Sequence, residues 1–210
     1  EHAEPGYYTV RLDNFGVNVE LTSTDRVGFH KYTYDNPKER RVMLDLGHVL
    51  QPDWSHKVTG NEYLFVNDST VEGTFKTQGW AHFHKIAYRI AFSEPVETAE
   101  LFVDGVRQDA GTEPVSTDKD LKLHYKFKES AEPLYVKVAL SPVDPEGAAR
   151  NMAAELPGWD FEATREASAN VWKEALNRIQ VESQDPTVLK NFYTALYHTM
   201  IAPFAYQDTD

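Results

Sequence analysis

The chain has 210 residues, 41% hydrophobic and 12% aromatic, which is enough to bury the core of one large β domain with a helical extension. Its net charge of −12 argues against binding to a nucleic-acid backbone or an anionic membrane surface, and is compatible with a neutral ligand. The absence of cysteine excludes disulfides, a thiolate nucleophile and a cysteine-ligated zinc. No apolar run approaches the roughly 18–20 residues of a transmembrane helix, and no signal peptide follows Glu1, although removal of one stays open because the chain does not begin with Met.

Three consecutive strands are predicted within residues 5–34. Apolar and polar residues alternate over residues 8–12 and again over residues 17–21, and a third run begins at Val27. Residues 13–16 separate the first two runs with Asn and Gly, which tolerate the positive φ angles of tight turns. The N-terminal part is therefore expected to begin as a meander.

About ten strands are predicted in total. The clearest alternation covers residues 121–127, and residues 134–140 are predicted to pair with it. Residues 47–60 are predicted to be irregular, and Asp104-Gly105 is a hairpin signal. The remaining predicted strands are residues 42–46, 63–66, 70–76, 83–92 and 101–104.

These half-buried strands have no helices between them, which favours antiparallel sheets over a parallel α/β sheet. The fold class is therefore mainly β, with an antiparallel β-sandwich over residues 1–143. The helices predicted over residues 144–210 are compatible with a linker, and the last of them also with the first helix of a further domain.

Each of three predicted helices follows an aspartate that can cap its first turn, and two of these aspartates precede a proline. The predicted helices are residues 146–156, residues 161–178, and a third that starts after Asp185 and ends before Pro203. Helical spacing predicts a buried stripe on the second helix, made of Phe161, Ala167, Val171, Ala175 and Ile179.

Histidine could point to a metal site, since there are eight of them. His82 and His84 are predicted on one face of a strand, but no spacing supplies a third ligand, so we interpret them as ordinary polar residues. His30 is interpreted as a core or hydrogen-bonded residue. His198 either faces whatever the last helix packs on or interacts with the dipole at the helix end, and we favour the second.

Four tryptophans are candidates for stacking on a sugar ring. Trp159 and Trp172 lie in the helical part and are interpreted as packing residues. Trp54 and Trp80 remain as stacking candidates. Trp80 follows Gly79 and precedes a strand, so it is expected at a loop edge, where burial and binding are equally open.

Asp208 and Asp210 carry alternate carboxylates that are able to bind a cation or sugar hydroxyls. We name both as substrate-binding candidates together with Trp80, although a solvated tail is the favoured interpretation of the acidic end. With 33 acidic residues, no catalytic pair can be singled out. Phosphate-binding glycine loops, a serine elbow and a Walker motif are absent.

Several segments together resemble the N-terminal region of glycoside hydrolase family 92, the calcium-dependent exo-α-mannosidases. The most specific are ELTSTDRVGFH at residues 20–30 and ALYHTM at residues 195–200. Further similar pieces are PGYYTVRL at residues 5–12, Gly79-Trp80, and the longer segment over residues 189–203. The resemblance covers nearly the whole chain and is weakest over residues 35–75 and 104–133.

The resemblance implies a supersandwich-like antiparallel β-sandwich over residues 1–143, followed over residues 144–210 by an α-helical linker and the first helix of an (α/α)6 barrel. Family members hydrolyse terminal α-mannosides with inversion, using calcium and two carboxylates that lie in the barrel. We therefore assign no catalytic residue and no metal ligand here, and expect this chain alone to be inactive.

The same resemblance sets the expected partners. They are a mannose-containing glycan such as an N-glycan and the remaining (α/α)6 domain, with no nucleic acid and no membrane span. Calcium is expected in the full-length enzyme, with none bound by this chain. The expected location is extracytoplasmic in a bacterium, that is periplasmic, outer-surface or secreted.

Two other hypotheses stay open. One is a carbohydrate-binding module that recognises glycan through Trp54 or Trp80 without catalysis. The other is a purely structural domain that packs on the barrel. It predicts a large apolar surface around Leu189, Phe192, Leu196 and Met200.

Overall fold

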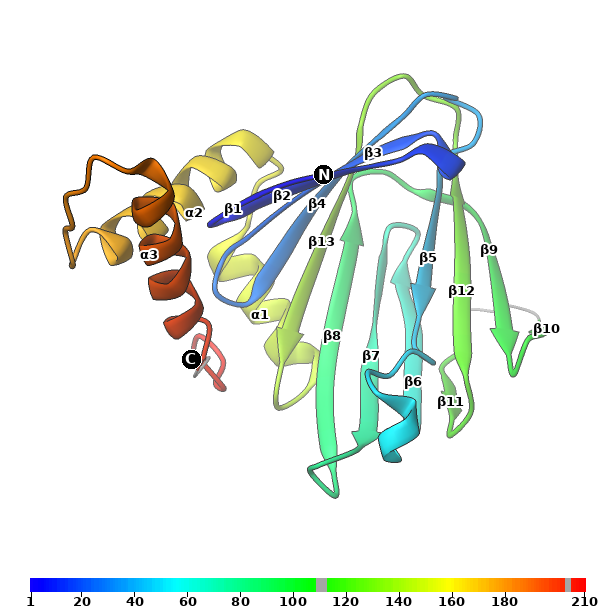
Figure 1. Cartoon of the computed structure of the whole chain (residues 1–210). Coiled ribbons are helices and arrows are strands. Elements are labelled where there is room, and N and C mark those ends of the chain that lie inside the picture. Colours follow the sequence, from blue (N-terminus) through cyan, green and yellow to red (C-terminus); the bar gives the residue numbers. More distant parts are fainter. Residues whose placement is uncertain (109–112, 203–204) are drawn as a thin grey trace.

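The structure is a computed structural model that describes residues 1–108, 113–202 and 205–210. Two antiparallel sheets pack on each other and three helices follow them in the sequence (Figure 1). The strands are β1 (His2–Glu4), β2 (Tyr7–Leu12), β3 (Val17–Ser23), β4 (Val27–Tyr34), β5 (Arg41–Asp45), β6 (Lys57–Asn67), β7 (Thr70–Gln78), β8 (His84–Phe92), β9 (Val96–Val103), β10 (Val106–Gln108), β11 (Val115–Thr117), β12 (Leu121–Phe127) and β13 (Leu134–Ser141). The helices are α1 (Pro145–Glu155), α2 (Phe161–Leu176) and α3 (Pro186–Thr199), with short 3-10 turns η1 (Asp13–Phe15) and η2 (Pro52–Trp54).

The larger sheet has the strand order β1-β2-β3-β4-β13-β8-β7-β6-β11, and the smaller sheet has the order β10-β9-β12-β5. All strand pairs in the described residues are antiparallel. The inner faces of the two sheets share one apolar core. Its centre is formed by side chains of β12 that are at most 1% exposed: Leu121, Leu123, Tyr125 and Phe127. The predicted antiparallel sandwich followed by helices is confirmed.

The predicted meander within residues 5–34 is also confirmed. Strand β3 pairs with β2 on one side and β4 on the other. Gly16, at the end of η1, has a φ of 57°, a left-handed conformation that glycine adopts without steric cost. The hairpin at Asp104-Gly105 joins β9 to β10, with φ angles of 49° and 75°.

The predicted pairing of residues 121–127 with residues 134–140 is wrong. Strand β12 pairs with β5 and β9 in the smaller sheet, whereas β13 lies between β4 and β8 in the larger one. Both strands turn an apolar face toward the same core, and Leu134 and Val136 of β13 belong to it. Alternation therefore reports the buried face of each strand and does not say whether the partner is hydrogen-bonded or lies across the core.

The prediction of irregular backbone over residues 47–60 is wrong for its last four residues. Strand β6 begins at Lys57 and pairs with β7 along its whole length. A register shift between Val58 and Gly60 interrupts the pairing there. Because a bulge breaks the two-residue period, the start of this strand carries no alternating pattern.

All three predicted helix starts are confirmed. Each capping carboxylate accepts a hydrogen bond from a backbone N–H in the first turn, which satisfies a donor that has no partner within the helix. The pairs are Asp144 with Gly147, Asp160 with Ala163, and Asp185 with Thr187. Helix α3 ends at Thr199, and Pro203 lies outside the described residues.

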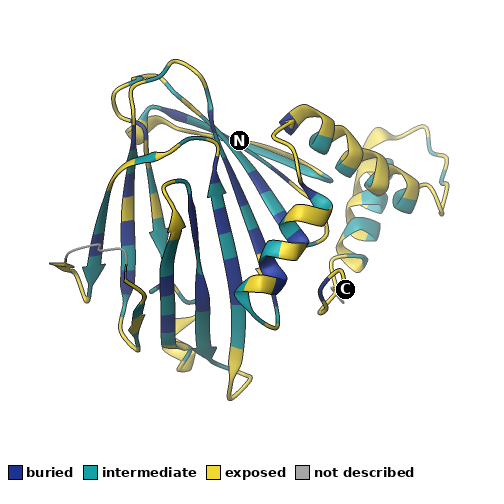
Figure 2. Cartoon of the chain, turned by 180° about the vertical axis from the view of Figure 1, so that it is seen from behind, coloured by how far each residue is buried: buried dark blue, intermediate teal, exposed yellow. Residues whose placement is uncertain are grey.

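Helix α1 lies across the outer face of the larger sheet (Figure 2). Lys137 of β13 is 3% exposed, and its Nζ donates to the carbonyl oxygen of Leu156 at 2.8 Å. Burial lowers the pKa of Lys137, while the carbonyl end of α1 and the ring of Trp159, 4.1 Å away, favour its positive charge. The second core under this helix contains Val27, Phe29, Ala139, Ala148, Leu156 and Phe161. Trp159 is 38% exposed, but its ring centroid lies 6.1 Å from that of Phe29, so it packs at the edge of this core, in agreement with its interpretation as a packing residue.

The predicted buried stripe of α2 is wrong. Only Phe161 is buried, whereas Val171 is 66% exposed and Ala167 is also exposed. Trp172 packs on Tyr197 of α3, with ring centroids 4.7 Å apart. Its interpretation as a packing residue is therefore confirmed. The helical period identified an apolar face, but the described part of the chain does not cover it. None of the helices in this part is long and apolar enough to cross a membrane.

Candidate functional site

An exposed aromatic surface lies where η2 approaches the connection between β7 and β8. The side chains of Trp54 and Trp80 are 63% and 79% exposed, and their ring centroids are 6.2 Å apart. His56 meets Trp80 edge-on, with centroids 6.1 Å apart and ring planes at 84°. We refer to Trp54, His56 and Trp80 as the aromatic platform.

A cavity of about 340 Å³ opens beside the aromatic platform. Nδ1 of His56 hydrogen-bonds with the carbonyl oxygen of Leu50 at 2.8 Å, which fixes the imidazole ring. The ring lies against Gly79, where a Cβ atom would be only 2.8 Å away, so a larger residue would displace it. Aromatic-lined hollows with a few polar groups are typical sites for small ligands. The lining includes His48, Leu50, His56, Phe75, Trp80 and His84.

The structure brings together the two tryptophans that were stacking candidates. The exposure of Trp80 is incompatible with the burial interpretation. Substrate binding by Trp80 stays a prediction. The sequence reasoning missed His56, because its role depends on contact with a residue 24 positions later in the chain.

The two histidines predicted on one strand face do not share one. His82 precedes β8, His84 is its first residue, and both are exposed, so the prediction of a shared face is wrong. Within the residues that the structure describes, no group of three or more His, Asp or Glu side chains is placed to hold a metal ion. Calcium binding by the full-length enzyme stays a prediction.

His30 is hydrogen-bonded, as predicted. Its Nδ1 lies 2.8 Å from the hydroxyl oxygen of Tyr32. Burial lowers the pKa of His30 to about 4, because the imidazolium form loses its hydration there. His30 is therefore neutral at pH 7 and does not provide a charge for binding. His198 is exposed in the last turn of α3, the position required for interaction with the helix dipole.

The acidic C-terminal segment is attached to the end of the sandwich. Asp208 is 9% exposed; its Oδ2 accepts from Oγ of Ser141 and its Oδ1 from Nδ2 of Asn151, both at 2.8 Å. Asn151 Nδ2 also donates to the carbonyl oxygen of Leu140, and its Oδ1 accepts from the backbone N–H of Thr209 at 3.0 Å. The solvated-tail interpretation is therefore wrong for Asp208.

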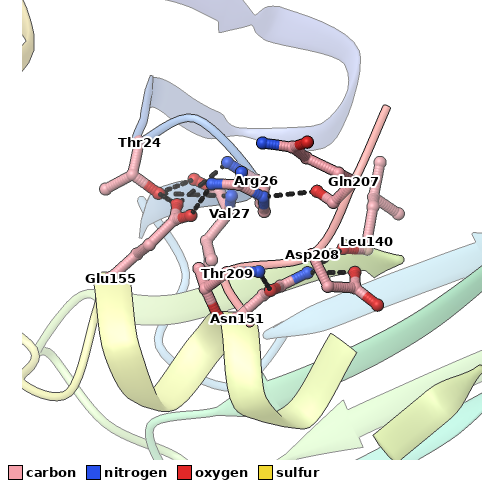
Figure 3. A network of polar contacts seen from close by, with 9 residues as sticks. All are labelled: Thr24, Arg26, Val27, Leu140, Asn151, Glu155, Gln207, Asp208 and Thr209. Atoms are coloured by element: carbon pink, nitrogen blue, oxygen red, sulfur yellow. Dashed lines mark hydrogen bonds and ion pairs between the residues drawn. The ribbon is translucent and has the colours of Figure 1, made fainter. Parts of the chain in front are cut away.

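A second set of contacts joins the same segment to the turn between β3 and β4 (Figure 3). Glu155 of α1 accepts from Oγ1 of Thr24 at 2.6 Å and from Nη1 of Arg26 at 2.7 Å. Nε of Arg26 also donates to the carbonyl oxygen of Gln207 at 2.7 Å. Burial acts to raise the pKa of Glu155, but these hydrogen bonds outweigh it and the pKa lies below its ordinary value. Three distant parts of the sequence thus meet at α1.

Asp210 lies in a different environment from Asp208. Its side chain is 59% exposed and accepts from Nε of Arg150 at 2.8 Å. For Asp210 the solvated interpretation fits. The two carboxylates that were candidates for one pair thus have separate partners, and a substrate-binding role of either stays a prediction.

Two family models match the chain in succession. Residues 1–141 match the glycosyl hydrolase family 92 N-terminal domain. Residues 147–210 match the glycosyl hydrolase family 92 catalytic domain. The chain belongs to glycosyl hydrolase family 92. The resemblance found in the sequence is thereby confirmed, and the chain is part of a family-92 glycoside hydrolase. A search of curated proteins found no match.

Solved structures of family 92 share the fold. The family GH92 alpha-mannosidase BT3965 from Bacteroides thetaiotaomicron is 26% identical at a TM-score of 0.89, covering 100% of this chain and 28% of that chain. Its complex with mannoimidazole gives the same values. The family GH92 inverting mannosidase BT2199 from Bacteroides thetaiotaomicron VPI-5482 is 21% identical at a TM-score of 0.82, covering 100% and 27%. The family-92 chain described here thus spans less than a third of the length of these relatives.

Proposed function

We propose that this chain is the N-terminal part of a secreted exo-α-mannosidase that hydrolyses terminal α-mannosides of glycans, including N-glycans, with inversion. The observation that carries the proposal is the succession of the family's N-terminal and catalytic-domain matches along one chain. Further support comes from the relative at 26% identity, which is named an alpha-mannosidase and has a structure in complex with mannoimidazole.

The aromatic platform is the proposed contact for the glycan. An exo-acting enzyme cleaves one terminal sugar, and we propose that the platform contacts the part of the glycan that remains. Trp54 and Trp80 present exposed indole faces, and the apolar faces of sugar rings stack on such groups. Asp210 has an exposed carboxylate that accepts hydrogen bonds from sugar hydroxyls, whereas both oxygens of Asp208 already accept bonds within the chain.

The remaining part of the catalytic domain is the proposed partner of the helical segment. A cavity of about 870 Å³ lies between the turn before β4, the end of α1 and the apolar face of α2, with Leu156, Val171 and Trp172 in its lining. On α3 and at its C-cap, the predicted apolar residues are half-buried at best, namely Leu189, Phe192, Leu196 and Met200. Without its partner the 210-residue chain is expected to self-associate, which sedimentation velocity measures. A monomer at all concentrations would count against this packing.

Catalysis requires groups that this chain does not supply. We propose that the two catalytic carboxylates and the calcium ligands belong to the remaining catalytic domain, and that the enzyme acts outside the bacterial cytoplasm. The test compares release of mannose from an α-mannoside by the full-length enzyme and by the 210-residue chain. We expect release only by the full-length enzyme, lost with a chelator and restored by calcium. Release of mannose by the 210-residue chain, or none by the full-length enzyme, would overturn the proposal.

The exposed tryptophan pair also favours a second candidate, a carbohydrate-binding module without catalysis. Titration of the 210-residue chain with mannose oligosaccharides, followed by tryptophan fluorescence, separates the two. A module binds glycan alone and loses binding in Trp80→Ala. The matched control is Phe15→Ala, since Phe15 is 76% exposed and lies in η1, outside the platform.

A further inference from the structure

Tyr206 places part of the catalytic-domain segment beside the aromatic platform. Its side chain is 61% exposed, and its ring centroid lies 6.5 Å from that of His84. His84 lines the same cavity as Trp80 and His56. Tyr206 belongs to the stretch that matches the catalytic domain, whereas the platform belongs to the stretch that matches the N-terminal domain. Through His84, Tyr206 is thus next to the cavity that the aromatic platform borders.

The position of Tyr206 is set by the residues that follow it. Gln207 accepts a hydrogen bond from Arg26, the buried Asp208 accepts from Ser141 and Asn151, and the N–H of Thr209 donates to Asn151. Asn151 is fully buried, and both of its amide groups are used in these bonds. This arrangement restrains the backbone at 207–209 and with it the backbone position of Tyr206, two residues before Asp208.

Helix α1 has a notch that admits the carboxylate of Asp208. At Gly147 a Cβ atom would lie 2.6 Å from Oγ of Ser141 and closer still to Oδ2 of Asp208. Any side chain at this position would push the carboxylate out. Because glycine is unfavourable inside a helix, its presence here is explained by the close approach that it permits. Gly147 is thus an independent indication that this contact is built into the helix.

We propose that Asn151 and Asp208, with Gly147 as the notch, are positioning residues that hold Tyr206 beside His84 and so add it to the glycan-binding surface of Trp54 and Trp80. The proposal rests on the proposed α-mannosidase function. Its ligand is the sugar that remains after the terminal mannose leaves. The contact between sandwich and catalytic segment then acts on substrate preference and not on the bond-breaking step.

The test uses the full-length enzyme with two substrates. An α-linked mannobiose carries a leaving-group sugar that reaches the aromatic surface, and α-mannosyl fluoride carries none. In Asn151→Ala and Gly147→Ala we expect the KM for mannobiose to rise about fivefold, which corresponds to the loss of one stacking contact. The kcat and KM for α-mannosyl fluoride should stay unchanged. Hydrogen exchange at the amide of Thr209 should accelerate in both variants. Gly158→Ala is the matched control, because a Cβ there meets nothing within 4 Å.

A variant that does not touch the buried contact keeps the test decisive. Tyr206→Ala should give the same rise in KM for mannobiose, and Tyr206→Phe should restore the value because the ring is kept. Faster exchange at Thr209 without a change in the mannobiose KM would overturn the proposal, as would equal losses on both substrates. If Trp80→Ala also leaves the mannobiose KM unchanged, the platform itself fails. If Trp80→Ala raises it and Tyr206→Ala does not, only this inference fails.

Discussion

Replacement of Arg40 by methionine is expected to open one end of the sandwich. Arg40 is fully buried, and its Nη1 donates to Oε2 of Glu94 at 2.8 Å and to the carbonyl oxygen of Lys128 at 2.7 Å. Nη2 donates to the other oxygen of Glu94 and to the carbonyl of Glu132 at 3.3 Å. These bonds tie the start of β5 to the connection between β8 and β9 and to the segment that crosses from β12 to β13.

The loss of stability in Arg40→Met follows from the buried partners that remain without the guanidinium group. Methionine fills the space of the arginine stem but leaves one carboxylate and two carbonyl groups without their donors. Removal of one partner from a buried ion pair typically costs about 3–5 kcal/mol. The side chain of Glu94 is 27% exposed, so hydration recovers part of this, and we expect a loss of about 3 kcal/mol in the free energy of unfolding.

The assay is urea unfolding of the 210-residue chain, followed by tryptophan fluorescence. Arg41→Met is the matched control, because the neighbouring Arg41 is 62% exposed and pairs with Glu39 at 3.1 Å. Exposed ion pairs contribute about 0–1 kcal/mol, so the control should lose less than about 1 kcal/mol. Similar losses in both variants would refute the reasoning. Combining Arg40→Met with Glu94→Leu should recover stability, since no buried carboxylate is then left unpaired.

Three further predictions test other contacts. Because the pKa of His30 is lowered to about 4 in the folded state, the unfolded chain binds the proton first as pH falls from 6.5. Stability should therefore be full above pH 6.5 and decline by at most about 3 kcal/mol toward pH 4, and His30→Gln should reduce this decline in unfolding titrations. Gly73→Ala should lower the free energy of unfolding by about 3 kcal/mol or prevent folding, because a Cβ atom there overlaps the carbonyl oxygen of Glu62. Gly158→Ala should leave the free energy of unfolding unchanged, and thermal unfolding of both variants measures the difference. Asp144→Ala should lose about 1 kcal/mol of unfolding free energy with the cap of α1, and no loss would mean that the cap is not needed.

Periodicity in the sequence predicted the buried faces of the strands, but not the sheet to which each strand belongs. Residues 128–133 carry the chain from the smaller sheet to the larger one, and the buried Arg40 stabilises this crossing through Lys128 and Glu132. An arginine in the polar stretch Glu39-Arg40-Arg41 has no periodic feature that marks it as buried. The topology thus depends on contacts between loops that are distant in the sequence, and a local sequence pattern does not predict such contacts.

The candidate site divides in the same way. Trp80 was accessible to sequence reasoning because Gly79 and the following strand place it at a loop edge. Asn151 and Asp208 are 57 residues apart, so no spacing rule connects them. In the structure, residues 147, 148 and 151 share a face of α1 and are all buried, so the asparagine on that face needs a polar partner.

The boundary between the two family matches does not coincide with a flexible connection. The catalytic-domain match begins at Gly147, inside α1. Helix α1 nevertheless packs on β13 and β8. Its residue Ala148 and its C-cap Leu156 belong to the second core. Lys137 of the sandwich also donates to the carbonyl of Leu156 at the end of this helix. Energetically the first helix of the catalytic match is therefore part of the sandwich. A rotation of α1 relative to the sandwich would expose the second core and leave the buried Lys137 without its acceptor. Helix α1 is therefore expected to hold the segments that follow it in a fixed position relative to the sandwich.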